Sequence, residues 1–107
     1  MGRYQLIVSS AAKPGREEEY TEWCRSQHLP DVLRVPGVLS AKRYRMVGEG
    51  PARFLTIFEM ETDQPFAVVE EITKRNGTPA MPSGDSYDPA SVRLDISEVQ
   101  MEFAEQI

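Results

Sequence analysis

The segment at residues 53–61 most constrains the fold, because it carries apolar side chains on both faces of a single strand. Apolar residues recur there at alternating positions in two interleaved sets, which is typical of a β-strand. One set is Phe54, Thr56, Phe58 and Met60, and the other is Leu55, Ile57 and Glu59. Such a strand predicts a sheet that needs cover on both of its faces.

Three further segments show strand patterns, at residues 3–9, 38–46 and 92–103. In the last of these the apolar positions change phase between Ile96 and Val99. A one-residue slip moves every side chain to the opposite face, so we expect a β-bulge or a bend near Ser97-Glu98.

The first predicted helix begins near Arg16 and carries three glutamates in its first turn, where the helix dipole favours negative charge. We expect Pro30 to end it, because the ring clashes with the preceding turn and disfavours helical geometry at Leu29. A short turn over residues 31–35 follows. The inward stripe of this helix is Tyr20, Trp23, Cys24 and Gln27.

The second predicted helix has Pro65 just inside its start and runs to about Arg75, where an Asn-Gly pair stops it. Thr62 or Asp63 is the expected N-cap. The expected inward side chains are Phe66, Val69 and Ile72.

The elements thus follow the order β-α-β-β-α-β, and at 107 residues we expect one α+β domain over residues 1–107 with a four-stranded antiparallel sheet. The three prolines and one glycine of residues 78–89 predict a long irregular loop, of the kind that is functional or mobile. Two helices cover only one sheet face. A second copy of the sheet, related by two-fold symmetry and tied on by the last strand, would cover the other.

Charge and cysteine content narrow the partners and the compartment. The net charge of −5 argues against nucleic acid and anionic membranes, which both favour a basic surface. The single cysteine, Cys24, cannot form an intrachain disulfide, and the apolar run at residues 4–8 is too short for a signal peptide or a membrane span. We therefore expect a cytoplasmic protein.

A resemblance to a known family adds to this interpretation. The residues that carry it are Tyr20, Trp23, His28-Leu29-Pro30-Asp31-Val32, then Val35-Pro36-Gly37-Val38, then Ala41, Arg43 and Tyr44. This pattern resembles the EthD-like group of the dimeric α+β barrel superfamily. The resemblance implies a ferredoxin-like fold, two sheets packed as a dimer, and a pocket between sheet and helices. Relatives include cofactor-free oxygenases, decarboxylases and isomerases of aromatic or polyketide-like compounds, and fold alone does not fix function.

Two residues of this pattern are candidate catalytic groups. His28 is the only histidine, and imidazole exchanges protons near pH 7. The alternative is a structural histidine that bonds a carbonyl at the helix end. Asp31 could orient His28, as a carboxylate orients a catalytic imidazole, or it could cap the turn that follows.

Five residues are candidate contacts to a substrate. Tyr20, Trp23 and Phe58 could form the aromatic wall of a pocket, or simply belong to the core. Arg43 and Tyr44 alternate along one strand, so one could reach the pocket and the other the dimer interface. Arg43 could hold a substrate carboxylate or phenolate, or form a surface ion pair.

Other chemistries have weaker support. Cys24 and His28 lie four apart, so a nucleophilic pair is conceivable, but no third orienting group accompanies them. One histidine with scattered carboxylates does not make a metal site. His28 as an axial haem ligand is a further alternative, since some relatives of the fold bind haem. We expect no cofactor.

The function that fits best is a small cofactor-independent enzyme of the oxygenase, decarboxylase or isomerase type. It would act on an aromatic or polyketide-like compound, with His28 as the proton-transfer group. The first alternative is a non-catalytic dimer that binds a small ligand or serves as an accessory protein. The second is a dimer whose pocket is filled by its own side chains. A cavity beside His28 would separate this last case from the others.

Overall fold

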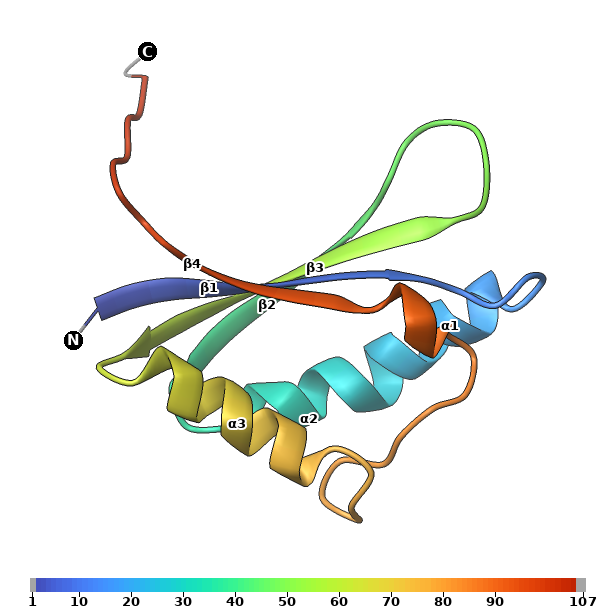
Figure 1. Ribbon diagram of the computed structural model, residues 1–107, viewed down its shortest axis with the longest axis horizontal. Helices are drawn as coiled ribbons and strands as arrows, with labels where there is room; N and C mark the ends of the chain where they lie inside the picture. Colours follow the sequence, from blue (N-terminus) through green and yellow to red (C-terminus); the bar gives the residue numbers. More distant parts are fainter. Residues whose placement is uncertain (1, 106–107) are drawn as a thin grey trace.

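One four-stranded antiparallel sheet organises the chain, in a computed structural model that describes residues 2–105 (Figure 1). Its strand order is β2-β3-β1-β4. The strands are β1 (Gly2–Ala11), β2 (Val38–Arg45), β3 (Arg53–Thr62) and β4 (Arg93–Glu98). The helical segments are α1 (Glu17–Trp23), the π-helical turn η1 (Cys24–His28), α2 (Leu29–Leu33), α3 (Pro65–Arg75) and the short turn η2 (Pro89–Ser91). The predicted βαββαβ ferredoxin-like arrangement is confirmed.

The two central strands form the longest ladder of the sheet. β1 pairs with β3 in register from Gly2 opposite Thr62 to Ala11 opposite Arg53. The two sets predicted for β3 lie on opposite faces as expected, and all four residues of the Phe54 set are buried. The helices all lie on this one side of the sheet (Figure 1).

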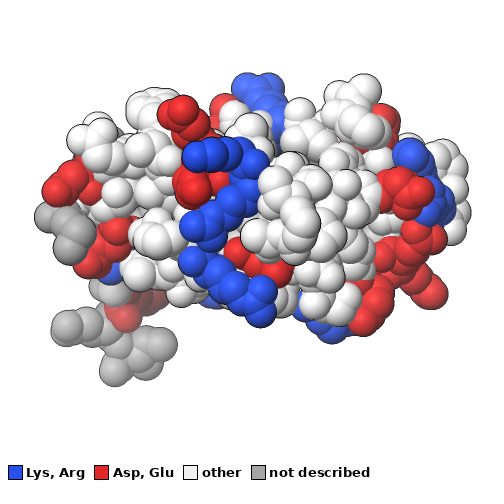
Figure 2. Space-filling view, turned by 90° about the horizontal axis from the view of Figure 1, so that it is seen from below, with Lys and Arg blue, Asp and Glu red and all other residues white. Residues whose placement is uncertain are grey.

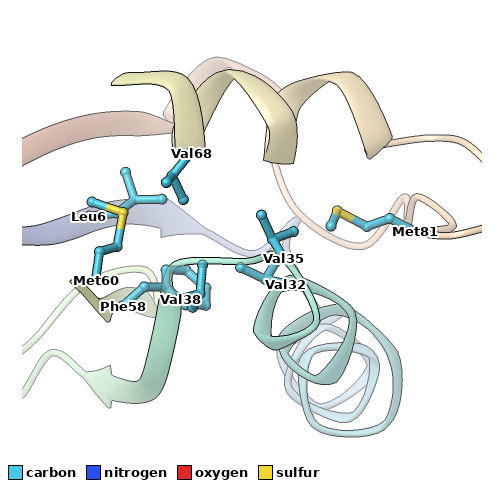
Figure 3. Packing of buried hydrophobic residues seen from close by; sticks show 8 residues of the cluster. All are labelled: Leu6, Val32, Val35, Val38, Phe58, Met60, Val68 and Met81. Carbon is cyan, nitrogen blue, oxygen red and sulfur yellow. The ribbon is translucent and has the colours of Figure 1, made fainter. Parts of the chain in front are cut away.

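The core between sheet and helices has contributions from every layer (Figure 3). Its buried residues are Leu6, Val32, Val35, Val38, Phe58, Met60, Val68 and Met81. Met81 comes from the irregular loop, which is therefore tied to the core. Seen from the helix side, a band of Lys and Arg side chains crosses the middle of the surface, and further ones lie towards its edges (Figure 2). No helix within residues 2–105 is long and apolar enough to cross a membrane.

The prediction that Pro30 ends the first helix is wrong. The helical path continues from α1 through the π-turn into α2, and Leu29 keeps helical angles of φ −64° and ψ −44°. In an α-helix the Pro30 ring would meet the carbonyl of Ser26 and leave it without a donor. The π-turn just before Pro30 changes that spacing, with the Leu29 N–H bonded to the Cys24 carbonyl, five residues back.

The second helix differs from expectation on its inward face and at its cap. Phe66 is 76% exposed, while Val68 is buried and Val69 and Ile72 pack against the core. Residues that are two positions apart in a helix point in directions about 200° apart. A helix that buries Val68 therefore turns Phe66 outward. The N-cap position is Gln64, without a side-chain cap, and Thr62 only accepts a hydrogen bond from its N–H.

The last strand is shorter than predicted. β4 ends at Glu98, which pairs with Tyr4 near the beginning of β1, so almost no partner strand remains for the following residues. Of the two alternatives, a bulge or a bend, the structure has a bend, because the strand ends here and the chain turns away from the sheet. Beyond it, the tail at residues 99–105 leaves the sheet on the side away from the helices (Figure 1). Its apolar side chains Val99, Met101 and Phe103 are exposed.

The core predicts a sharp contrast between two methionines. Met60 is fully buried, so Met60→Ala leaves a cavity and should lower the free energy of unfolding by about 2–5 kcal/mol. Met101 is 66% exposed in the tail, so the matched Met101→Ala should change it by less than about 0.5 kcal/mol. Denaturant unfolding of both variants measures the difference. Equal effects would contradict the described packing.

Candidate functional site

A cavity of about 140 Å³ lies between the sheet and the helices. β1, β3 and β4 supply one wall, the α1–η1–α2 path a second and α3 a third, and Tyr87 and Val92 close it from the last connection. His28 is the one titratable base among the lining residues, and within residues 2–105 no aspartate, glutamate, lysine or arginine lines the cavity. This space lies beside His28, and the protein's own side chains leave it open.

The Trp23 indole and the His28 imidazole stack inside this cavity wall, with ring centroids 4.5 Å apart and planes 13° from parallel. The two residues are five apart, which on a regular α-helix would separate them by about 140° around the axis. The π-turn η1 removes this separation, because one extra residue in the turn brings positions i and i+5 onto the same side. The same distortion that accommodates Pro30 therefore aligns the two rings.

His28 is held in its neutral form by its surroundings. Burial lowers its pKa below the ordinary value of 6.5, and the negative charge of Asp31 opposes that shift without outweighing it. The His28 Nδ1 atom is buried and has no hydrogen-bond partner within residues 2–105. A neutral imidazole with an unsatisfied ring nitrogen is equipped to accept a proton or a hydrogen bond from a ligand.

Asp31 is buried but is not hydrogen-bonded to His28. Its Oδ2 accepts a hydrogen bond from Gln27 Nε2 at 2.6 Å, and its Oδ1 pairs with Arg34 Nη1 at 2.8 Å. Both carboxylate oxygens are thus engaged along the helix. Asp31 therefore acts on His28 through its charge. It does not form the hydrogen bond that would orient the imidazole, which was one of the two roles considered for it.

Tyr20 and Cys24 lie deeper in the same wall. The Tyr20 hydroxyl is hydrogen-bonded to the Ser10 hydroxyl at 2.6 Å, and burial raises the Tyr20 pKa. Burial likewise raises the pKa of the Cys24 thiol. A protonated thiol is a poor nucleophile, so this environment disfavours the Cys24–His28 pair.

The candidate substrate contacts divide into two groups. Trp23, Tyr20 and Phe58 line the cavity together with His28. Arg43 lies outside it, with its guanidinium 3.9 Å from the Phe54 ring centroid and 4.5 Å from that of Tyr20. Tyr44 lies on the opposite face of β2 and is exposed. Arg43 and Tyr44 thus occupy opposite faces as predicted, but neither reaches the cavity.

Sequence reasoning missed Tyr87, the aromatic residue of the irregular loop. Its ring lies 5.9 Å from Trp23 and 5.6 Å from Tyr20, so it extends the aromatic wall. Backbone bonds from Lys13 N to Ser86 O and from Asp88 N to Ala11 O hold the loop there. A Cβ atom on Gly84 would lie 2.7 Å from the Trp23 ring, so only glycine fits this approach. The sequence did contain one sign of this role, because Tyr87 is an aromatic residue in a loop made mostly of prolines and small residues.

No three histidine, cysteine, aspartate or glutamate side chains gather at a possible metal site in the part of the chain that the structure describes. His28 is the single imidazole among the side chains that line the cavity, and one imidazole is too few ligands for a metal site. The site is therefore an apolar, aromatic cavity with one proton-accepting group.

Solved structures share this fold, whereas no family model and no curated protein sequence matches the chain. The heme-degrader MhuD from Mycobacterium tuberculosis, solved with two hemes in its active site, aligns with a TM-score of 0.63 at 19% identity over 94% of this chain and 99% of its own. An EthD family protein from Bacillus halodurans aligns with a TM-score of 0.51 at 17% identity, over 89% and 97%.

A dimeric ferredoxin-like protein from an uncultured marine organism aligns with a TM-score of 0.63 at 11% identity, over 96% of this chain and 100% of its own. These likenesses confirm the predicted ferredoxin-like fold. The EthD family protein among them supports, at the level of fold, the resemblance seen in the sequence.

The neutral state of His28 predicts a pH dependence of stability. Because its folded pKa lies below the ordinary 6.5, the unfolded chain binds more protons just below that pH. The contribution of His28 to the free energy of unfolding should therefore fall as the pH drops from about 6.5 to the folded pKa, and level off below it.

Nuclear magnetic resonance of the single histidine ring measures this pKa directly. Unfolding of the wild type and of His28→Gln at several pH values measures the linkage, and the variant should lack the decrease. A folded pKa at or above 6.5 would contradict the described environment.

Proposed function

We propose that this protein is a small enzyme that works without a cofactor, binds a single-ring aromatic compound in the cavity and uses His28 to accept a proton from it. The observation that carries the proposal is the neutral His28 imidazole, stacked on Trp23 in an otherwise uncharged cavity. Cavity size sets the ligand class. An apolar cavity of about 150 Å³ is known to bind benzene, and the cavity here is about 140 Å³.

The proposed step is a proton transfer in an apolar setting. His28 takes a proton from an acidic O–H or activated C–H of the ligand, which leaves a ligand anion beside an imidazolium. The buried Asp31 carboxylate favours that imidazolium by its charge. Because the lining offers no cation, a carboxylate substrate is disfavoured, and a phenol-type compound fits better. An oxygenase reaction would then require molecular oxygen as co-reactant, whereas an isomerase would return the proton.

Haem fits this cavity poorly. A porphyrin is several times larger than one aromatic ring, and the volume of about 140 Å³ suits a single ring. The proposed reaction therefore does not involve haem.

Filling the cavity tests the binding half of the proposal. Trp23 is the only tryptophan, so its fluorescence should change when phenol or a substituted phenol binds. Val69 lines the cavity, and Val69→Phe should abolish this saturable change, because the added ring occupies the space. Val47 is fully exposed, and the matched Val47→Phe should bind as the wild type does. Equal binding by all three proteins would contradict a ligand site here.

Substitution of His28 separates an enzyme from a binding protein. If His28 moves the proton, His28→Gln should lower turnover of a phenol-type substrate by about 10²–10⁴-fold with affinity retained. Unchanged turnover would refute the catalytic role. Ligand binding without turnover by the wild type, across a panel of phenols supplied with oxygen, would favour the alternative of a non-catalytic ligand-binding protein.

We further propose that the protein is a homodimer in which a second copy covers the open sheet face. Ile57 and Tyr44 lie on that face, and within residues 2–105 only the tail approaches it, through Val99 and Met101. Apolar residues at alternate positions of the tail, Val99, Met101 and Phe103, would allow it to pack along the partner. The face carries Ile57 and Tyr44 among polar side chains that include Gln5, Lys42 and Glu59, and we infer that a second copy related by two-fold symmetry covers it.

Mass measurement in solution tests the dimer. Ile57→Lys places a charge in the proposed interface and should produce a monomer at micromolar concentration. Phe66 is exposed on the helix side, so the matched Phe66→Lys should leave the mass unchanged. A wild-type monomer at micromolar concentration would refute the proposal.

A further inference from the structure

A second hollow, here called the arginine groove, lies beside the outer strand β2 and outside the aromatic cavity. Its volume is about 380 Å³. It is lined by Thr21, Arg25, Leu29, Arg43, Tyr44, Arg45 and Phe54. Three of these seven side chains are guanidinium groups, and none is a carboxylate. Three cations thus surround one hollow of a chain whose net charge is −5, and two of them, Arg25 and Arg45, also line a neighbouring hollow that carries Glu17, Glu18, Glu19 and Glu22.

Arg43 is held rigidly at the base of this groove. Its guanidinium lies over the Phe54 and Tyr20 rings, and its Nη2 donates a long hydrogen bond of 3.4 Å to Thr21 Oγ1. Cation–π contacts on two rings fix the plane of the group but leave its hydrogen-bonding donors largely unused. Fixing a side chain beforehand removes much of the entropic cost that ligand binding otherwise carries.

The charge of Arg43 is uncompensated within the described chain. A guanidinium is protonated at all ordinary pH values, and a buried one is normally paired with a carboxylate. Among residues 2–105 no ion pair involves Arg43, and its Nη1 atom is buried without a hydrogen-bond partner. An anion in the groove would balance this charge.

The other two arginines are placed to complete such a site. Arg45 follows Arg43 by two residues on β2, is exposed, and forms no ion pair in the described part of the chain. Arg25 comes from η1 and pairs only with the exposed Glu22, which is a weak interaction at the surface. Planar guanidinium groups bind oxyanions through paired N–H donors.

We propose that the arginine groove binds one oxyanion, a phosphate or carboxylate group of a small molecule, at a site separate from the aromatic cavity. The Tyr20 ring separates the two sites, since one of its neighbours is the Arg43 guanidinium and it also lines the cavity. The two sites suit different ligands, because the cavity has an uncharged lining and the groove carries three arginines that attract an anion. The proposal does not depend on the catalytic role of His28.

Titration with inorganic phosphate and with acetate, at an ionic strength held constant with chloride, tests the site. Backbone resonances of β2 and η1 should shift with phosphate or acetate and reach saturation. Arg45→Gln should weaken this binding about tenfold, because one charge-assisted donor is lost from an exposed position that does not affect folding. Arg93→Gln removes the same charge from β4, away from the groove, and should bind as the wild type does.

Two further variants define the outcome. Arg43→Lys keeps the charge but loses the planar donors, and it should also weaken binding, whereas His28→Gln should not. Saturation with phosphate alone or with acetate alone supports the site and identifies which group it takes. Absence of saturation with both anions overturns the proposal. Equal weakening by Arg45→Gln and Arg93→Gln also overturns it, because it would show a general effect of charge.

Discussion

The π-helical turn at Cys24–His28 is the feature on which the rest of the site depends. An α-helix could neither carry Pro30 at this point without losing a hydrogen bond nor bring Trp23 and His28 to one side. One extra residue in the turn accommodates Pro30 and also brings Trp23 and His28 to one side. It keeps the helical path continuous along the sheet and stacks the imidazole on the indole at 4.5 Å. Such local widening of a helix is often found at functional sites.

Burial then divides the chemistry of the molecule into two environments around Tyr20. On one side, the apolar cavity keeps His28 neutral, because an imidazolium there would lose its hydration. On the other side, Arg43 remains charged, because a guanidinium cannot release its proton, and aromatic faces replace part of its hydration. The same aromatic cluster therefore supports a proton acceptor and a fixed cation a short distance apart.

The two faces of the sheet differ in what covers them, although β3 carries apolar residues on both. Helices and the irregular loop cover the face of Phe54 and Phe58, and their packing produces the cavity. Within residues 2–105, the face of Ile57 has only the tail near it, because β4 runs out of partner residues where β1 begins. The short pairing of β4 with β1 thus leaves the tail, with its exposed Phe103, off the sheet.

The order and type of the main elements and the two faces of β3 could be predicted from the sequence, because period and local turn chemistry are properties of neighbouring residues. The pocket near Trp23 and His28 was expected from the resemblance to the EthD-like group, and not from these patterns. The continuous helix through Pro30, the inward side of α3, the position of Tyr87 and the separation of Arg43 from the cavity were decided only by tertiary structure. Each of these depends on packing between segments far apart in the chain, which overrides local preference when burial and ring stacking outweigh it.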